Sequence, residues 1–526
     1  MTSVADGLSI YPASGRYESR YANLYDSLAA TAGRFPHKAG LRDAEQTTTY
    51  LQFKREVDIL AGALKRRYGL KRGDTAGLLM DNSIDFLRAF YAMAKIGCTS
   101  VMLNTKHQAP ELRQCLRETG ARLVLAQVKW RNKLEDRAGD DRPGITYDPE
   151  ILYDKVEEGS SIERILSEEL PDDGPSEPNP AAAAVMFTSG TTGSPKGAAI
   201  DHENILQTAY SYEQAQGLTS EDITVLCVPV FHILGLSCVS TLFIYLGATL
   251  ILEPVFNEER VLETISRFGA THFHSAPTVY IRLARMLDRK ATLQLDSLRM
   301  CVCGGAPISD ADRDLFCKYA GNASFRIAYG MTETAGGGML SRSHKGRAAP
   351  CEGLSVKIVN EDMQAVCPGE TGQILLRGGI VIKGYLNGKG ADSFFDGWLC
   401  SGDLARMFPD GSIIFQGRCK EMINRGGEKV FPSEVEKVML SFPGIEQAAV
   451  FGIPDAVYGE VPAAAVVFRD GMPATDETLR DYLRARLAKY QIPVCIDMRK
   501  ELPYTASGKV AKHVLASEMK RHNQLR

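Results

Sequence analysis

The sequence has no marked excess of charge and no ordered cysteine pattern. Its 526 residues include 61 basic and 64 acidic side chains, which gives a formal net charge of −3. Because a polyanion attracts a basic surface, we do not expect a nucleic-acid partner. The 12 cysteines form no CxxC pairs, and the alternating Cys301 and Cys303 lack further ligands at zinc spacing. We therefore expect buried free thiols, as in a reducing cytosol.

Signals for export, membrane insertion and repetition are also lacking. The opening residues MTSVADGLSIYPASG contain neither a basic nor an apolar segment, so we expect a cytoplasmic protein without a secretory signal. Residues 231–252 are apolar and long enough to span a bilayer, but they include His232 and a break at Gly247. We predict a buried helix leading into a buried strand rather than a membrane span. Neither a repeat of about 20 to 50 residues nor a low-complexity tract is present.

What the sequence does contain is an alternation of apolar, strand-like runs and helical runs. It is clear between about residues 180 and 330 and weaker over 50–125. Alternation of this kind predicts an α/β fold of mostly parallel sheets with helices on both faces. The expected strands are 181–187, 223–230, 248–252, 271–276, 298–303 and one ending at Tyr329, and the expected helices begin near Asp201, Asn257, Pro277 and Ser309.

The character of the sequence changes after about residue 350. Short strands with Gly and Asp turns predict a small antiparallel β unit there. Beyond Arg418 follow helices expected from Ser433 and Thr475 and strands expected at 448–453 and 462–469. Since 526 residues exceed one typical domain, we predict a large N-terminal domain over 1–418 and a small α+β C-terminal domain over 419–526.

The strongest local signal is the loop at residues 188–197, TSGTTGSPKG. Its glycines let the backbone approach a ligand closely, and its hydroxyls, N–H groups and Lys196 can all donate to phosphate. A surface linker is the alternative interpretation, but the loop follows a buried strand, where α/β proteins place their ligands. It is not a Walker P-loop, because Lys196 precedes Gly197 rather than Ser or Thr. The other candidate lysine, Lys509, does not fit that motif either, because Val510 follows it.

Together with other motifs, this loop resembles the adenylate-forming superfamily of acyl-CoA synthetases, carrier-protein adenylation domains and firefly luciferase. The resemblance extends over almost the whole chain, from about residue 25 to 512. Ser401 is a small departure, since the family often has Thr there. The further motifs, in the family's order, are 229–235 (PVFHILG), 304–307 (GGAP), 329–333 (YGMTE), 401–403 (SGD), 417–418 (GR) and 503–509 (PYTASGK).

The resemblance implies that ATP activates a carboxylic acid as an acyl-adenylate, with PPi released, and that a thiol then takes the acyl group. A carboxylate with a pKa of about 4 is already ionised, so no general base is needed. By resemblance, Lys509 contacts the carboxylate and the α-phosphate, Glu333 holds Mg²⁺, and Thr332 donates to the α-phosphate. The resemblance places Tyr329 against adenine and Asp403 on the ribose. The expected ATP-binding residues are Thr188, Ser189, Gly190, Thr191, Thr192, Gly193, Lys196, Gly305, Ala306, Pro307, Tyr329, Gly330, Met331, Thr332, Asp403 and Arg418.

The C-terminal domain is expected to swing about a hinge at Lys420 between the two half-reactions. The loop that it would bring in contains Gly426, Gly427 and Lys429, and by resemblance it lines a coenzyme A tunnel. Coenzyme A is the favoured acceptor, and we expect no carrier domain in the chain, which ends shortly after Lys509. A separate carrier protein is the alternative acceptor. A luciferase-like oxygenase is a further alternative, because it shares these motifs. A non-catalytic relative that only binds a ligand is disfavoured, because it would not need Lys509.

By resemblance, the acyl pocket is walled by the stretches near residues 231–236, 274–278, 302–306 and 329–339. These stretches contain no Arg or Lys to meet a second carboxylate, which favours an apolar aryl or medium- to long-chain monoacid. His232 is expected to orient the carboxylate or gate the thiol, with plain packing as the alternative, and His272 and His274 are expected in the core or pocket wall rather than on a metal. The expected acyl-pocket residues are His232, Leu234, His274, Cys303, Gly336 and Gly337.

Overall fold

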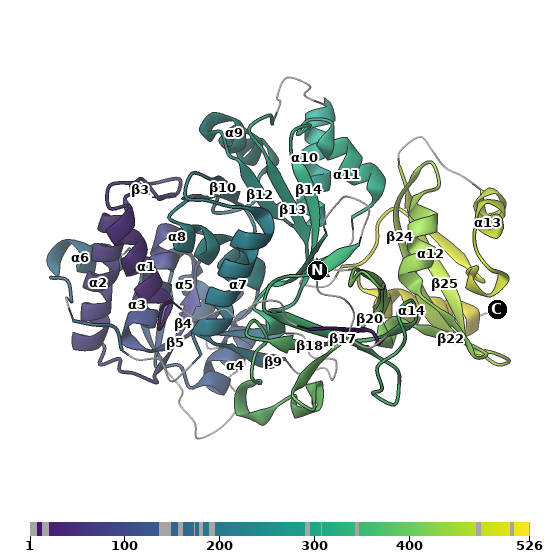
Figure 1. Ribbon diagram of the computed structural model, residues 1–526, viewed down its shortest axis with the longest axis horizontal. Coiled ribbons are helices and arrows are strands. Elements are labelled where there is room, and N and C mark those ends of the chain that lie inside the picture. Colours follow the sequence, from purple (N-terminus) through teal and green to yellow (C-terminus); the bar gives the residue numbers. More distant parts are fainter. Residues whose placement is uncertain are drawn as a thin grey trace.

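A computed structural model describes the chain over residues 8–12, 20–135, 149–155, 161–172, 174–177, 182–188, 195–289, 295–306, 308–341, 347–469, 475–504 and 510–524. Two large sheets and the helices between and around them form the bulk of the molecule, and a smaller unit made by the last hundred residues lies at one end (Figure 1). The predicted α/β class with an additional small C-terminal unit is confirmed.

The centre of the larger sheet is parallel, as the alternation predicted. Its strands run β11–β10–β12–β13–β14, with α9, α10 and α11 on one face and α7 and α8 on the other. The bounds are β10 Ile223–Leu226, β11 Thr249–Leu252, β12 His272–Ser275, β13 Met300–Gly304, β14 Ser324–Gly330, α7 His202–Gln216, α8 Leu242–Leu246, α9 Glu258–Phe268, α10 Pro277–Arg289 and α11 Asp310–Cys317.

Helix ends follow the predicted caps. Asp201 is the N-cap of α7 and Asn257 that of α9, where its side chain accepts from the Arg260 N–H. Ser309 Oγ accepts from the Asp312 N–H at 3.0 Å and so begins α11. One strand boundary was wrong: residues 223–230 were expected as one strand, but β10 ends at Leu226. The reason is tertiary, because the backbone of residues 228 and 230 bonds to the side chain of Asn82 instead of to a neighbouring strand.

Apart from the exposed His232 near its start, the apolar run at residues 231–252 is mostly buried inside the molecule, as predicted. A π-helical segment, Leu234–Thr241, continues into α8, and Gly247 ends that helix with a positive φ of 72° before β11 begins. The left-handed conformation there suits glycine, which carries no Cβ. Over the residues that the structure describes, no helix has the length and apolarity needed to cross a bilayer.

The second sheet has the strand order β7–β6–β4–β5–β8–β9 and is parallel except for the hairpin of β8 and β9. Helices α1, α2 and α3 pack with α7 and α8 between the two sheets, and α4 covers the outer face. The bounds are α1 Leu24–Arg34, α2 Tyr50–Arg66, β4 Thr75–Leu79, α3 Ile84–Ile96, β5 Thr99–Met102, α4 Ala109–Thr119, β6 Leu123–Ala126, α5 Arg131–Glu135, β7 Glu150–Tyr153, α6 Ile162–Glu168, β8 Ala184–Thr188 and β9 Lys196–Ile200.

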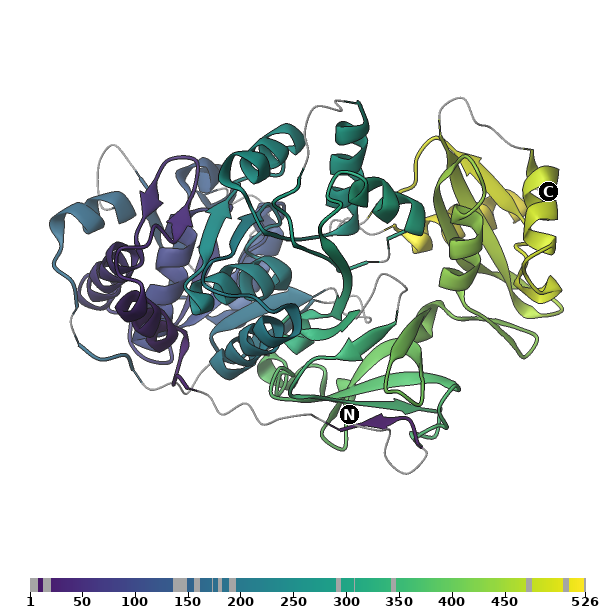
Figure 2. The same cartoon turned by 45° about the horizontal axis from the view of Figure 1, so that its top comes forward.

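The predicted antiparallel β unit is present and extends the larger sheet from β14 onward. The chain folds back and forth there over its own apolar core, shown in green in Figure 2. The bounds are β15 Gly338–Ser341, β16 Ala348–Pro350, β17 Leu354–Val359, β18 Thr371–Gly378, β19 Phe394–Phe395, β20 Trp398–Met407 and β21 Ile413–Arg418, and short strands β1 Ile10–Tyr11, β2 Leu41–Arg42 and β3 Thr47–Thr48 join the sheet edges.

A third, five-stranded sheet begins directly after β21, with two apolar clusters of its own. Ion pairs link this unit to the rest of the molecule: Arg285 on α10 lies 2.7 Å from Glu446, and Lys429 lies 2.9 Å from Glu361. The bounds are β22 Ile423–Arg425, β23 Glu428–Val430, α12 Pro432–Leu440, β24 Ile445–Asp455, β25 Gly459–Phe468, α13 Asp476–Arg484, β26 Ile496–Arg499 and α14 Lys512–Gln524.

Candidate active site

The predicted phosphate loop joins β8 and β9, which form an antiparallel hairpin with Thr188 opposite Lys196. The sequence predicted the strand before the loop but not the strand after it. Lys196 Nζ lies 3.4 Å from Asp392 Oδ1 and 5.7 Å from the ring centroid of Tyr385. Its charge therefore lies next to the segment containing Tyr385 and Asp392, which follows strand β18 of the larger sheet. The loop residues Ser189, Gly190, Thr191, Thr192 and Gly193 lie outside the described residues.

Glu333 contacts the hydroxyl of the same tyrosine. It sits in the short 3-10 turn Thr332–Thr334 that follows β14, and Tyr385 Oη donates to its Oε1 at 2.9 Å. Burial raises the pKa of Tyr385, and the Glu333 carboxylate raises it further, so the hydroxyl remains a donor. An isolated bridge between Ala198 and Tyr385 connects the strand β9 to this segment. Tyr385 thus brings Lys196 and Glu333 to one place.

This arrangement fits a magnesium–phosphate group. Mg²⁺ is usually held in proteins by one or two carboxylates together with substrate phosphates and water. Glu333 supplies one half-buried carboxylate, and Lys196 supplies a cation near the ring of the tyrosine that Glu333 contacts. Sequence analysis missed Tyr385, because an isolated tyrosine more than fifty residues after Glu333 belongs to no motif.

A second polar cluster lies where β14, β20 and β21 meet. Tyr329 Oη donates to Asp403 Oδ2 at 2.7 Å, while Arg418 Nε lies 3.2 Å from Asp403 Oδ1. The rings of Tyr329 and Phe415 stack at 4.0 Å with an angle of 21°. Burial, and next the charge of Asp403, holds the pKa of Tyr329 well above its ordinary value. Three predicted residues are therefore in contact, and Phe415 is an addition that the sequence gave no signal for.

Glycines make room between these clusters. A Cβ at Gly330 would lie 2.4 Å from the Gly336 carbonyl oxygen, so only glycine permits that backbone approach. At Gly305, which has a positive φ of 88°, an added Cβ would meet no described atom within 4 Å. Open space therefore begins beside β13, at the carboxyl end of parallel strands, where α/β proteins bind ligands. Ala306 follows at the exposed edge, and Pro307 lies outside the described residues.

The predicted acyl-pocket residues divide between two faces of the larger sheet. His274 points toward α7, and its ring centroid is 6.1 Å from that of Tyr212. Gly336 and Gly337 lie on the same side, against Cys238 and Thr208 respectively. Cys303 is on the opposite face, packed in the core beneath α9, α10 and α11. It therefore does not share a wall with His274, because side chains alternate along a strand.

His232 and Leu234 approach this region from the segment before α8. His232 is exposed, and its ring centroid is 4.9 Å from that of Phe231. Its pKa is lowered to about 4, first because surrounding protein atoms desolvate the ring and then because of the charges of Lys106 and His107. The imidazole is consequently neutral near pH 7, with one donor and one acceptor nitrogen. Leu234 is half-buried against the main core.

Three fully buried histidines carry a testable pH dependence. Burial lowers the pKa of His202 and of His274 to about 3, and it lowers that of His272 well below its ordinary value. In the unfolded chain these rings titrate near about 6.5, so below that pH the unfolded state binds more protons. The free energy of unfolding is expected to be retained above about pH 6.5 and to fall below it, by up to ~1.4 kcal/mol per pH unit for each ring.

Urea denaturation between about pH 7.5 and about pH 5 measures this slope. His202→Gln removes one of the titrating rings and is expected to make the slope shallower. The same substitution at the exposed His37 is the matched control and is expected to leave the slope as it is. Equal slopes for the wild type and His202→Gln would contradict the assignment.

The predicted thiol-tunnel loop is the hairpin of β22 and β23. Gly426 and Gly427 form its turn with positive φ values of 60° and 97°, as a two-residue hairpin requires. Lys420 is exposed in the 3-10 turn Cys419–Glu421, between the larger sheet and the third sheet. Lys509 lies outside the described residues, and the flanking Tyr504 and Val510 pair as an isolated bridge.

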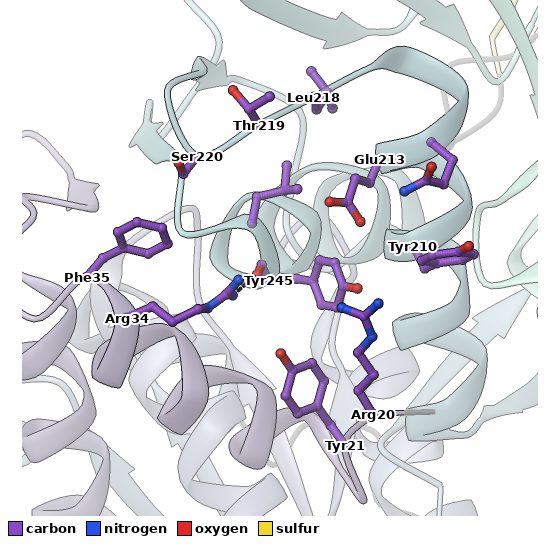
Figure 3. Close-up of a pocket in the computed structure, with 12 residues that line it drawn as sticks. Arg20, Tyr21, Arg34, Phe35, Tyr210, Glu213, Leu218, Thr219, Ser220 and Tyr245 are labelled. Carbon is purple, nitrogen blue, oxygen red and sulfur yellow. Dashed lines mark hydrogen bonds between the residues drawn. The ribbon is translucent and has the colours of Figure 1, made fainter. Parts of the chain in front are cut away.

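A pocket of about 320 Å³ lies away from these groups, between α1 and the ends of α7 and α8 (Figure 3). Arg34 donates there to the Tyr245 carbonyl at 3.0 Å, and Glu213 lies across from it. Burial raises the pKa of Glu213. None of the predicted site residues lines this pocket, so it is separate from the candidate active site.

Comparisons with known proteins identify the family of the chain. The AMP-binding enzyme family matches residues 28–386, and the AMP-binding enzyme C-terminal domain matches residues 434–509. A feruloyl-CoA synthase from an Amycolatopsis species is 33% identical over 488 residues, covering 91% of this chain and 95% of its own.

Two solved structures are similar over nearly the whole fold. An anthranilate CoA ligase in complex with anthranoyl-AMP superposes with a TM-score of 0.86 at 27% identity, covering 95% of this chain and 98% of the other. An o-succinylbenzoate coenzyme A synthetase from Bacillus subtilis, in complex with ATP and magnesium ion, has a TM-score of 0.78 at 29% identity, covering 93% and 98%.

Proposed function

Because the chain belongs to the AMP-binding enzyme family, we propose that it is an AMP-forming acid–CoA ligase whose site residues act as described below. The overall reaction consumes a carboxylic acid, ATP and coenzyme A and yields acyl-CoA, AMP and PPi. The observation that carries the residue assignment is the convergence of Glu333, Lys196 and the Tyr329–Asp403–Arg418 cluster at one end of the sheets.

In the first half-reaction a carboxylate oxygen attacks the α-phosphorus of ATP, a P–O bond forms, and PPi leaves. Both reactants are anions, so the protein's task is to align them and stabilise the developing charge. Lys509 is assigned to the carboxylate and the α-phosphate, because a compact ammonium can bridge two anions. Thr332, next to Glu333, donates to the α-phosphate.

The nucleotide is held by the two clusters. Asp403 accepts from the ribose hydroxyls with Arg418 beside it, and the Tyr329 ring, stacked on Phe415, lies against adenine. The backbone around Gly305 borders the adenine slot. Glu333 holds Mg²⁺, which neutralises phosphate charge when bound, and Lys196 contacts the phosphates with the loop after β8.

In the second half-reaction the sulfur of coenzyme A attacks the acyl carbonyl, and AMP leaves. His232, neutral at pH 7, donates one hydrogen bond to the carbonyl oxygen of the acyl group without adding charge. The hairpin with Gly426 and Gly427 admits the pantetheine arm, and Lys429, which pairs with Glu361 in this structure, is released to meet a phosphate. The acyl portion lies along His274, Gly336 and Gly337, without Cys303.

These two steps require the C-terminal unit to move, and we assign the boundary between 1–418 and 419–526. Two observations support a hinge at Lys420. The larger sheet ends with β21 at Arg418, and the third sheet begins with β22 at Ile423. Between them, only a single turn, closed by Met422 N–H to Arg418 O at 3.1 Å, joins the units along the chain.

Lys420→Pro is expected to separate the half-reactions. Proline fixes φ near about −65° and restricts the preceding residue, so rotation about the hinge is blocked. Acyl-AMP formation should stay within about threefold of wild type, while transfer from supplied acyl-AMP to coenzyme A should fall at least ~10-fold. Rapid-quench assays of each step measure this, with Lys420→Ala as the matched control that keeps φ free. Equal loss in both steps would contradict the hinge.

The function itself is tested by incubating the protein with ATP, Mg²⁺ and a panel of aryl and fatty acids, with and without coenzyme A. Mass spectrometry follows PPi, acyl-AMP and acyl-CoA. Formation of acyl-CoA that requires coenzyme A supports the proposal. Acyl-AMP that accumulates and is not transferred to coenzyme A would point to a separate carrier protein, and release of neither product with any acid would contradict the proposal.

A further inference from the structure

The inner face of α7 is polar although it is buried. Thr208, Tyr212 and Gln216 recur every fourth residue and therefore share the side of the helix that faces the larger sheet. Thr208 and Tyr212 are fully buried and Gln216 is 4% exposed. A helix face packed on a sheet is normally apolar, so each of these buried polar groups needs a hydrogen-bond partner.

Opposite this face, β12 presents two histidines that differ in their bonding. His272 Nδ1 lies 3.0 Å from Thr224 Oγ1, and its Nε2 lies 3.0 Å from Gln216 Oε1, so both nitrogens are used. His274, two residues on and only 1% exposed, has no hydrogen-bond partner at either nitrogen among the described residues. On the facing helix α7, Thr208 Oγ1 is likewise without a partner in the described structure.

Both unpartnered groups lie along the proposed acyl site. His274 Nε2 is 3.5 Å from the position of a Cβ at Gly304, next to the open space at Gly305. Thr208 Oγ1 is 2.9 Å from the position of a Cβ at Gly337. Tyr212, one turn along α7 from Thr208, has its ring centroid 6.1 Å from that of His274 and donates its hydroxyl to the Gly336 carbonyl at 3.3 Å. The two groups therefore belong to the lining that runs from β13 to the turn before β15.

A buried polar atom without a hydrogen-bond partner is destabilising, and native proteins rarely leave one in that state. The missing partner at His274 must be neutral and able to hydrogen-bond. Burial lowers the pKa of His274 to about 3, so its ring is uncharged and offers one donor and one acceptor. A hydroxyl, which is also both donor and acceptor, is the complement of this ring, whereas a carboxylate would require a cation.

We propose that the acid taken by this enzyme carries a hydroxyl on its acyl or aryl portion, and that His274 binds this hydroxyl, with Thr208 as a second partner. His274 is thus a specificity-determining residue. The inference rests on the proposed function and revises the expectation of a purely apolar acid. A site built to bond a hydroxyl discriminates strongly against the analogue without it, because its own polar groups are then left unpaired.

The test uses acids paired by a single hydroxyl: benzoic and para-hydroxybenzoic, cinnamic and para-hydroxycinnamic, and a fatty acid with its terminal-hydroxy form. Wild type is expected to show at least ~10-fold higher kcat/KM for the hydroxylated member of one or more pairs. His274→Leu is expected to remove that preference, by lowering kcat/KM for the hydroxylated acid ~10- to 100-fold and leaving its partner within about threefold. His274→Asn, which keeps a donor and an acceptor, should restore part of the preference.

His202→Leu is the matched control, because His202 is also a buried histidine but lies at the other end of α7, where its Nδ1 accepts from the N–H of Leu24, the first residue of α1. It should leave the selectivity ratio unchanged whatever its effect on stability. Equal kcat/KM within every pair, or an equal loss for both members in His274→Leu, would overturn the inference and assign a buried water to the ring.

Binding measurements keep this test independent of turnover. Calorimetry with paired acyl sulfamoyl adenosines, with and without the hydroxyl, should show at least ~10-fold tighter binding of the hydroxylated form. Equal binding of both forms would overturn the inference while leaving the ligase function in place. Absent turnover together with a retained binding preference would contradict the ligase function alone.

Discussion

Lys509→Ala is expected to reduce acyl-AMP formation by ~10²- to 10³-fold, which is the largest effect predicted for a single side chain of this enzyme. The carboxylate and the α-phosphate repel each other, and the ammonium is the group assigned to both. Acyl transfer from supplied acyl-AMP to coenzyme A should stay within about threefold of wild type, because the proposed domain rotation removes Lys509 from the site in that step. Single-turnover assays of the two half-reactions measure the difference.

Lys500→Ala is the matched control, since Lys500 is an exposed lysine in the same part of the chain. It is expected to change neither half-reaction. Wild-type rates of acyl-AMP formation in Lys509→Ala would remove this residue from the mechanism, and equal loss in both half-reactions would show that the substitution disturbs the C-terminal unit as a whole.

Asp403→Asn is expected to have a large effect on the binding of ATP. The carboxylate accepts from Tyr329 Oη at 2.7 Å and pairs with Arg418 at 3.2 Å, and it is 7% exposed. Hydrogen bonds to a charged group are worth about 1.5–3 kcal/mol, which corresponds to ~10- to 100-fold in affinity. The KM for ATP should rise by that factor, with a smaller effect on the KM for the acid.

Asp410→Asn is the control for this change. Asp410 is an exposed aspartate in the turn between β20 and β21, where it accepts from the Ser412 N–H at 3.0 Å. It should leave the KM for ATP unchanged. Thermal unfolding of both variants separates binding from stability, and an unaltered KM for ATP in a folded Asp403→Asn protein would contradict the ribose assignment.

Much of the fold could be predicted because short-range patterns determine it. The caps at Asp201 and Ser309 act within one turn, and the apolar run of β13 is buried on both faces, so local sequence located these elements. Strand ends were less certain. β10 stops at Leu226 because Asn82, far away in sequence, takes over the backbone bonds that follow.

The sequence by itself determined the loop at 188–197, the order of the motifs and the alternation that brings parallel strands together, because each depends on residue type and spacing. Only the tertiary structure decided which side chains meet. Tyr385 lies between Lys196 and Glu333 because β9 approaches a segment that follows the other sheet. Cys303 and His274 face opposite sides of the sheet, and His274 meets a polar helix face, because the pairing of strands and the packing of α7 set those directions. Neither is encoded in local spacing.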